Sequence, residues 1–282
     1  MAQNGQRTRP APMSTTVRST ERLSDSMIRI VVGGPDLARF QPSVHADSYV
    51  KVLFLNPLVD YARPLDLNQI RAEQPAENWP RLRSYTVRHW NQAALELTLD
   101  FVVHGDEGLA GPWAAKAQVG DELLLQGPGG GYSPDPAVDW YLLIGDESAL
   151  PAIAVILEAL PADARGQLFV EVHGSADEVP LHVPNNLTLT WVHRTSHPVG
   201  QRLVEVVRNA AVPAGTVSAF VHGEAGFVKQ LRALLRIERG IPADRLSISG
   251  YWRAGTDDEG WRAGKSAWNS EVEQAEIAAG VS

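Results

Sequence analysis

The sequence of 282 residues contains no cysteine. Disulfide bonds, cysteine-ligated iron–sulfur clusters and cysteine zinc sites are therefore excluded, and so is a thiol nucleophile. If the protein carries out redox chemistry, a bound organic cofactor must carry the electrons.

Basic residues are fewer than acidic residues. The chain has 25 lysines and arginines against 33 acidic residues, which leaves a net charge of −8. No nucleic-acid partner is expected, because such partners need a basic surface. A local basic pocket remains compatible with this balance, because net charge says little about one cleft.

Long apolar runs are absent too. No run approaches the roughly 20 residues that cross a bilayer, and residues 1–14 have no apolar core of the kind found in signal peptides. We expect a disordered lead-in over residues 1–14, no membrane insertion and a cytoplasmic location.

Short apolar runs alternate with turn residues over residues 15–134. This alternation predicts an antiparallel β-barrel or sandwich, interrupted by one helix that begins near Pro112. Between two of the strands, the segment 56–80 holds four prolines and several acids. We expect this segment to be a long surface loop.

From residue 135 onward, apolar strands alternate with helical segments. This order predicts five strands in an open parallel sheet over residues 135–269, followed by a tail or helix over residues 270–282. Ligands of such sheets bind beyond the carboxyl ends of the strands, so the turns at those ends are candidate binding positions.

Two of those turns carry acidic residues where a strand gives way to a helix. A helix start can hold a polar ligand group, and Ser148 is a candidate N-cap, but the full GxGxxG fingerprint is absent. Each turn alone fits a capped helix as well as a nucleotide site, and two turns at one sheet edge favour the nucleotide. The residues are Gly145, Asp146, Glu147 and Ser148 in one turn and Glu224 and Ala225 in the other.

Three histidines stand at strand ends. His104 precedes the glycine-rich turn 105–111, and its residue type alone favours a surface hydrogen-bonding role over a ligand contact. His193 and His197 lie four residues apart, but the glutamate of HExxH is missing and Pro198 follows. A metal site there is therefore disfavoured.

Trp252 and Arg253 end the last predicted strand and would face the cleft between the domains. Arg253 fits an anion site there and an exposed surface position equally well. Aromatic residues at a strand end usually serve packing, which is the simplest interpretation of Trp252 taken alone.

The stretch RLRSYTVRHW over residues 81–90 is typical of a strand. Because successive side chains alternate between the two faces, Arg83 and Tyr85 share one face, and Ser84 and Thr86 share the other. In an ideal strand, Thr86 therefore points away from Tyr85.

Taken together, the motifs resemble those of the siderophore-interacting protein family, which are FAD-dependent ferric-siderophore reductases with a ferredoxin-reductase-like fold. In chain order they are SYVKVLF, RSYTVR, DFVVHGDEGLAGPWA, GDELLLQGP, LLIGDESALPAI, HGEAG and GYWRAG, and the resemblance extends from about residue 15 to 269. It implies a Greek-key FAD-binding barrel followed by a parallel-sheet NAD(P)H-binding domain. We expect the protein to be a monomer.

The resemblance implies that FAD lies along the barrel. Arg83 would contact the diphosphate, Tyr85 would lie against the isoalloxazine ring, and Thr86 would contact its N5 edge. The implied FAD-binding residues are Arg83, Ser84, Tyr85, Thr86, Asp100, Phe101, Val102, Val103, His104, Gly108, Leu109, Ala110, Gly111, Trp113 and Ala114.

By the same resemblance, the two acidic turns receive NADPH or NADH, with Gly145, Asp146, Glu147, Ser148, Glu224 and Ala225 at the cofactor. Lys51, Trp252 and Arg253 are implied to hold an anionic ferric siderophore. A third basic position of the family follows the last barrel strand. Here that segment reads GPGGGY over residues 127–132 and contains no arginine or lysine.

The implied reaction passes electrons from NAD(P)H through FAD to Fe(III) in a siderophore and releases Fe(II) for iron acquisition. Three alternatives stay open: an NAD(P)H:flavin or quinone reductase of the same superfamily, a ferredoxin-driven siderophore reductase, and a non-catalytic siderophore-binding protein. The choice between NADH and NADPH is also open. Arg194, Lys229 and Arg232 are candidates for the 2′-phosphate contact that NADPH needs.

Overall fold

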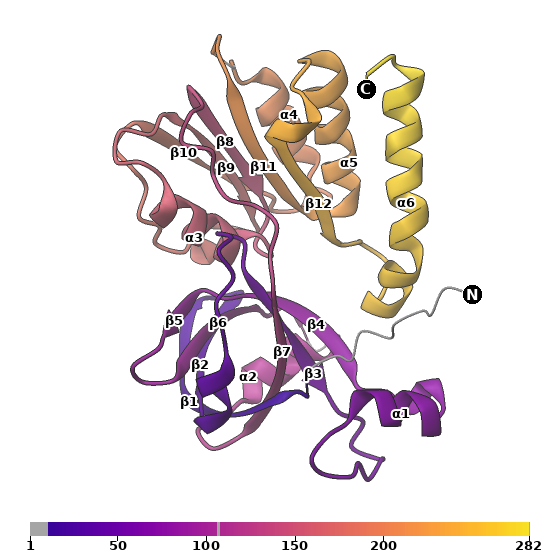
Figure 1. Ribbon diagram of the computed structural model, residues 1–282. Helices are drawn as coiled ribbons and strands as arrows, with labels where there is room; N and C mark the ends of the chain where they lie inside the picture. Colours follow the sequence, from indigo (N-terminus) through magenta and orange to yellow (C-terminus); the bar gives the residue numbers. More distant parts are fainter. Residues whose placement is uncertain (1–10, 106–107, 212, 282) are drawn as a thin grey trace, which may run out of the picture.

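The computed structural model describes residues 11–105, 108–211 and 213–281. Figure 1 shows two lobes, a mainly β lobe formed by the first half of the chain and a sheet with helices on both sides formed by the second. The expected fold class, a β-barrel followed by an open parallel sheet, is confirmed. The first strand begins at Met13, two residues earlier than expected.

Seven antiparallel strands form the barrel lobe, in the order β4-β3-β7-β1-β2-β6-β5. β4 also packs beside β6, which brings one end of the sheet round to the other. The strands are β1 Met13–Ser24, β2 Met27–Gly33, β3 Tyr49–Phe54, β4 Arg81–Thr86, β5 His89–Asn91, β6 Glu96–Val102 and β7 Glu122–Gly129. A 3-10 turn, η1 Pro35–Arg39, follows β2, and helix α2 Ala110–Lys116 follows β6.

Alternation of side chains along β3 shows how the barrel core forms. Val50 and Val52 have no exposed surface, whereas Lys51 between them is half-buried on the opposite face. β-branched side chains suit this pleated, one-sided burial. The core is completed from β6, where Leu97 and Leu99 are fully buried.

The segment 56–80 is not the structureless loop that its prolines suggested. It contains helix α1 Leu67–Glu73, whose N-cap Asp66 accepts hydrogen bonds from two backbone amides, and the 3-10 turn η2 Ala76–Asn78. Leu67 and Ile70 are buried in a small separate cluster against the barrel. Burial of this apolar face stabilises a helix that is too short to persist alone.

Five parallel strands form the second lobe, in the order β10-β9-β8-β11-β12. They are β8 Trp140–Gly145, β9 Gly166–Val172, β10 Leu187–His193, β11 Val217–Glu224 and β12 Leu246–Trp252. The chain passes from β8 to β9, which pairs with one edge of β8. It later forms β11, which pairs with the other edge of β8. The crevice at a switch point of this kind is where open parallel sheets bind ligands.

Helices cover both faces of this sheet. α3 Leu150–Ala159 packs on one face, and α4 Gln201–Asn209, α5 Ala225–Ala233 and α6 pack on the other. Three short turns complete the lobe: η3 Ser175–Asp177, the π-helical η4 Leu234–Glu238 and η5 Ala243–Arg245.

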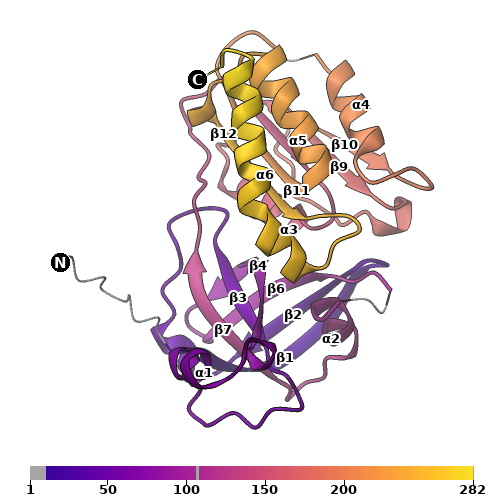
Figure 2. The ribbon, with the colours of Figure 1, turned by 90° about the vertical axis from the view of Figure 1, so that its right-hand side faces the viewer.

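Helix α6 runs from Asp258 to Ala278, so the expected boundary at residues 269 and 270 falls inside one continuous helix. Trp261 and Trp268 on its buried side pack edge to face, with ring centroids 5.6 Å apart. Figure 2 shows α6 running along the α/β lobe, with its first turn reaching down to the barrel. One element therefore touches both lobes.

The lobes also meet through side chains of β2 and of the chain after β4. Met27 of the barrel is fully buried in the hydrophobic cluster of the α/β lobe. Arg88 pairs with Glu158 of α3, with 2.6 Å between Nη2 and Oε1. No helix within the described residues is long and apolar enough to cross a membrane.

Candidate functional site

β4 places an aromatic ring at the junction of the two lobes. The ring of Tyr85 lies against Phe101, with centroids 4.1 Å apart, and Phe101 lies 5.5 Å from Trp113 of α2. Burial raises the pKa of Tyr85, so its hydroxyl stays protonated at physiological pH. Tyr85 thus offers a half-buried flat surface held in place by the barrel core.

Arg83 lies on the same face of β4 as Tyr85 and forms ion pairs with two carboxylates of the protein. Its guanidinium donates to Glu259 through two nitrogens, at 2.8 and 3.1 Å, and pairs with Asp258. Both acids belong to the first turn of α6, and only 11% of the Arg83 side chain is exposed. A planar guanidinium that binds two carboxylates suits phosphate oxygens equally well.

Two glycines before α2 have open space beside their backbone. Gly105 and Gly108 have φ of +54° and +82°, and a Cβ at either position would meet nothing within 4 Å. At Gly111 a Cβ would approach the carbonyl oxygen of Val102 to 3.2 Å. Arg83, Tyr85 and this open backbone together fit a cofactor that combines a diphosphate with a flat ring, as FAD does.

The other predicted FAD contacts differ in their partners and exposure. Asp100 is buried and engages Arg29 through both carboxylate oxygens, at 2.7 and 2.8 Å. Phe101 lies wholly inside the barrel core, whereas His104 is exposed. Of the remaining candidates, Ala110 and Ala114 are buried, Val102, Val103, Leu109, Gly111 and Trp113 are half-buried, and Gly108 is exposed.

The opposite face of β4 carries Ser84 and Thr86, as alternation predicts. In the antiparallel register Ser84 lies opposite Lys51 and Thr86 lies opposite Tyr49. The Lys51 ammonium donates to the Ser84 hydroxyl and lies 4.9 Å from the centre of the Tyr49 ring. Thr86 is half-buried on this face, away from Tyr85.

In the α/β lobe, Asp146 joins the carboxyl ends of three strands. Its Oδ2 accepts hydrogen bonds from the backbone amide of Glu224 and from the indole of Trp252, both at 2.8 Å. Glu224 in turn caps α5 by accepting from the amides at the start of that helix. The two acidic turns therefore converge at the switch point, and Trp252 is fixed there by Asp146.

Burial makes Asp146 an unusual carboxylate. Removal from water and the nearby charge of Glu147 raise its pKa to about 6, although hydrogen bonds from Ser148, Trp252 and Glu224 oppose the shift. Ser148 is not the N-cap that its position suggested. Its hydroxyl donates to Asp146 at 2.5 Å, and α3 begins after Ala149 without a side-chain cap.

The three candidate contacts for a 2′-phosphate all hold carboxylates. Arg194 lies between Glu147 and Glu171, at 3.1 and 3.3 Å. On the outer helices, Lys229 pairs with Glu271 at 3.0 Å and Arg232 pairs with Glu276 at 2.5 Å. A phosphate at any of these positions would have to compete with an existing ion pair.

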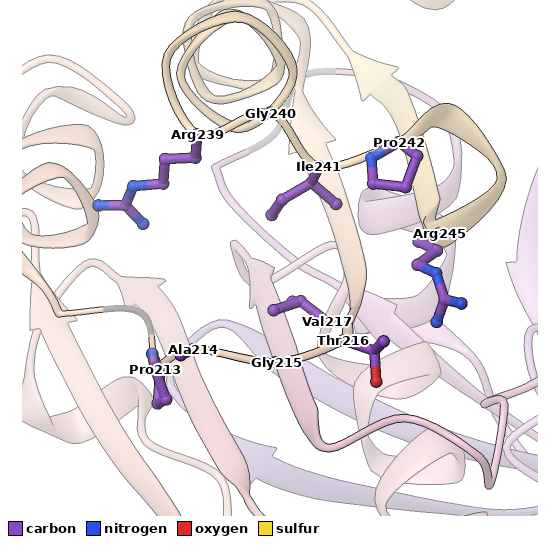
Figure 3. Close-up of a pocket in the computed structure, with 10 residues that line it drawn as sticks. All are labelled: Pro213, Ala214, Gly215, Thr216, Val217, Arg239, Gly240, Ile241, Pro242 and Arg245. Atoms are coloured by element: carbon purple, nitrogen blue, oxygen red, sulfur yellow. The ribbon is translucent and has the colours of Figure 1, made fainter.

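A separate hollow of about 510 Å³ lies at the other edge of the parallel sheet. Figure 3 shows its lining from the start of β11 and from the turn before β12, with Arg239 and Arg245 on opposite sides. These are amino ends of parallel strands, where ligands of such sheets do not bind. The hollow therefore lies apart from the candidate site.

The two histidines at the end of β10 have different surroundings. The Nε2 atom of His193 lies 2.7 Å from Oε1 of Glu178, while His197 is exposed. Among the residues that the structure describes, no group of three or more His, Asp or Glu side chains is arranged to hold an ion.

An antiparallel barrel joined to a five-stranded parallel sheet defines the ferredoxin-reductase-like fold, which solved ferredoxin and dioxygenase reductases share. Two family models cover most of the chain: the siderophore-interacting FAD-binding domain matches residues 16–132, and the siderophore-interacting protein domain matches residues 138–255. The chain belongs to the siderophore-interacting protein family, and its barrel is the family's FAD-binding domain.

Three curated relatives are similar to this chain over most of its length. An uncharacterised protein of Mycobacterium tuberculosis is 45% identical over 92% of this chain and 95% of the relative. The ferric vibriobactin reductase of Vibrio cholerae is 36% identical over 85% and 88% of the two chains. The NADPH-dependent ferric-chelate reductase of Escherichia coli is 30% identical over 85% and 92%.

Among solved structures, the siderophore-interacting protein SipS of Aeromonas hydrophila matches with a TM-score of 0.79 and 28% identity. The match covers 93% of this chain and 99% of that one. The similarity therefore extends over both lobes.

Proposed function

We propose that this protein is an FAD-dependent reductase that takes electrons from NADPH or NADH and delivers them to Fe(III) in a siderophore. The observation that carries the proposal is the combination on the barrel of Arg83 and Tyr85 on one face of β4 with the open glycine positions before α2. The names of the Vibrio and Escherichia relatives support the same activity.

On the barrel side, Arg83 and Tyr85 would contact two different parts of FAD. Arg83 would bind the FAD diphosphate through its two-nitrogen fork, and Tyr85 would present its ring to the isoalloxazine. FAD, when bound, accepts a hydride from a nicotinamide and gives up its electrons one at a time. Because Thr86 lies on the face opposite to Tyr85, Tyr85 and Thr86 cannot both reach one side of the ring by their side chains.

On the α/β side, Asp146, Glu224 and Trp252 form a closed hydrogen-bond network that fixes the carboxyl ends of β8, β11 and β12. We assign to this edge the positioning of the nicotinamide. Asp146 and Glu224 are buried, so a nicotinamide bound at this edge would be partly screened from water.

On the substrate side, the protein need not bind iron itself. Fe(III) is a hard ion held by siderophore oxygens, and Fe(II) is held less tightly by the same donors, so reduction releases the metal. One NAD(P)H carries two electrons and would reduce two ferric complexes, with one proton released. The task of the chain is to hold an anionic complex near the flavin, where Lys51 offers a cation.

The test is an anaerobic stopped-flow experiment on the FAD-loaded protein. NADH and NADPH are mixed with it separately, and the flavin absorbance reports reduction. The reduced protein is then mixed with ferric hydroxamate and ferric catecholate complexes. We expect bleaching by at least one nicotinamide and reoxidation by at least one ferric complex.

The other functions give different outcomes. Rapid reoxidation by free flavin or quinone but by no ferric complex would identify a flavin or quinone reductase and contradict the proposal. A protein that binds a ferric complex yet is bleached by neither nicotinamide would contradict the NAD(P)H-dependent form. Bleaching by a reduced ferredoxin alone would identify a ferredoxin-driven reductase.

A further inference from the structure

The carboxyl ends of β9 and β10 lie beside the edge that is assigned to the nicotinamide. In the parallel register, Val170 of β9 lies beside Gly145, the last residue of β8, and His193 of β10 lies beside Val172. Neighbouring strands are about 4.8 Å apart, so the end of β10 lies roughly 10 Å from the end of β8. Because the nicotinamide is assigned to β8, β11 and β12, the adenosine half of the dinucleotide has the ends of β9 and β10 to bind.

Arg194 follows β10 but is already neutralised. Its Nη2 atom lies 3.1 Å from Oε1 of Glu147, and its Nη1 atom lies 3.3 Å from Oε1 of Glu171. Both carboxylates are buried, and Glu171 also accepts a hydrogen bond from the backbone amide of Gly200 at 2.8 Å. Two buried carboxylates exceed the charge of one guanidinium. Arg194 therefore ties the turn after β10 to the ends of β8 and β9, and it is a poor partner for a phosphate.

Arg202 supplies a second guanidinium at the same strand end. It is the second residue of α4, and its Nη1 atom donates to the carbonyl oxygen of His193, the last residue of β10, at 2.8 Å. The residue is exposed, and within the part of the chain that the structure describes no carboxylate pairs with it. The single carbonyl contact holds the guanidinium at the strand end and leaves other N–H donors for a ligand.

The two turns around Arg202 offer further hydrogen-bond donors. The backbone amide of Thr195 donates to the carbonyl oxygen of His173 at 2.9 Å, which joins the turn after β10 to the turn after β9. Asp177 is buried, and its carboxylate accepts from the amide of Gly174. The exposed polar side chains of the turns are therefore uncharged or basic, and they do not repel a phosphate. They are those of His173, Ser175, Thr195, Ser196 and His197.

We propose that Arg202 selects the reductant by binding the 2′-phosphate of NADPH. This inference rests on the proposed function and deepens it, because it names one of the two nicotinamides as the electron donor. A guanidinium binds phosphate oxygens through parallel N–H donors, whereas NADH carries only a hydroxyl at that position. The three candidates drawn from the sequence are all held by carboxylates, and Arg202 takes the role that was assigned to them.

Binding of nucleotide fragments tests this contact without electron transfer. Adenosine 2′,5′-bisphosphate and 5′-AMP are titrated in turn into the oxidised, FAD-loaded protein, and calorimetry gives each Kd. We expect the bisphosphate to bind about tenfold more tightly than 5′-AMP to the unmodified protein, because of the guanidinium–phosphate contact. Arg202→Gln should abolish this preference without weakening 5′-AMP binding. Arg202→Lys, which keeps the charge, should retain part of it.

Bleaching of the flavin gives a second measurement. Arg202→Gln should lower the rate constant for reduction by NADPH about tenfold through the same lost contact, while the rate constant for NADH stays unchanged. Arg208→Gln is the matched control, because Arg208 lies on the same helix and pairs with Glu238 at 2.6 Å. It should behave like the unmodified protein with both nicotinamides. The FAD content of each variant, read from flavin absorbance, shows whether the cofactor site is intact.

Failure of this inference and failure of the proposed function give different results. Equal affinity of the unmodified protein for the two fragments would overturn the inference. So would an Arg202→Gln protein that keeps the full preference for the bisphosphate, or one that loses affinity for both fragments equally. In each of these cases bleaching by either nicotinamide leaves the proposed function in place. If neither nicotinamide bleaches the flavin of the unmodified protein, the NAD(P)H-dependent function itself is wrong.

Discussion

At the scale of single residues, Arg83 and Asp146 carry the most information about the site. Arg83 shares a face with Tyr85, as the alternation of β4 predicted, but its partners Asp258 and Glu259 lie more than 170 positions away in the chain. Sequence spacing contains no signal for such a contact. The same limit applies to Asp146, whose link to Trp252 arises only from the sheet order.

Replacement of Arg83 by glutamine should weaken FAD binding at least tenfold, equivalent to about 1.4 kcal/mol, because a two-nitrogen anion contact is lost. Titration of the apoprotein with FAD, followed by quenching of flavin fluorescence, measures the Kd. Arg88→Gln is the control, since Arg88 pairs with Glu158 of α3 instead. Equal affinity of both variants would remove Arg83 from the cofactor site.

Asp146 should leave a signature in the pH dependence of stability. Its pKa is raised to about 6 in the folded protein, so the folded state keeps a proton that the unfolded chain releases above about pH 4. The free energy of unfolding should therefore fall as pH rises from about 4 to about 6, by roughly 3 kcal/mol from this group.

Comparison with Asp146→Asn isolates this contribution. His222, whose pKa burial lowers to about 3, acts in the opposite direction between about pH 3 and 6.5, and it is unchanged in the variant. Denaturant unfolding at several pH values gives the difference between the two proteins. A difference that stays constant from pH 4 to pH 6 would show that Asp146 titrates normally.

At the scale of elements, the strands were predictable, α1 was not, and of α6 only the last part was. Val50 and Val52 alternate with polar residues, and this period specifies β3 without any tertiary information. α1 was missed because prolines at 57, 64, 75 and 80 surround a seven-residue helix. The first turns of α6 contain Gly260 and Gly264, which weaken intrinsic helix preference, and packing of Trp261 compensates for them.

The first turn of α6 should compete with FAD for Arg83. In the double variant Asp258→Asn and Glu259→Gln, the guanidinium loses both carboxylates, and we expect FAD to bind several times more tightly. The FAD titration described above measures this change. Glu271→Gln, which breaks the exposed pair with Lys229 on the same helix, should leave the affinity unchanged. Weaker binding in the double variant would mean that these acids help to hold the cofactor.

At the scale of the whole molecule, the junction depends on apolar contact as well as on ion pairs. Met27 begins a barrel strand but is buried with Tyr132 and Phe220 in the α/β lobe. The sequence showed two domains, yet no periodicity could reveal that one methionine of the first belongs to the core of the second.

Met27→Ala should reduce the free energy of unfolding by about 2–5 kcal/mol through the cavity it leaves. Because the lost contacts join the lobes, unfolding in denaturant should also separate into two steps. Met13→Ala removes the same side chain from within the barrel core, so it should destabilise the protein without dividing the transition. A single sharp transition for Met27→Ala would show that other contacts couple the lobes.

The position of α6 has a mechanical consequence. Its 21 residues make a rod about 30 Å long, anchored along the α/β lobe by Trp268 and by the ion pair of Glu276 with Arg232. A rotation of that lobe by about 5° would move the far end of the rod by 2–3 Å relative to β4, by the geometry of a lever of that length. Such a displacement would separate Asp258 and Glu259 from Arg83. The angle between the lobes and the ion pairs of Arg83 would therefore change together.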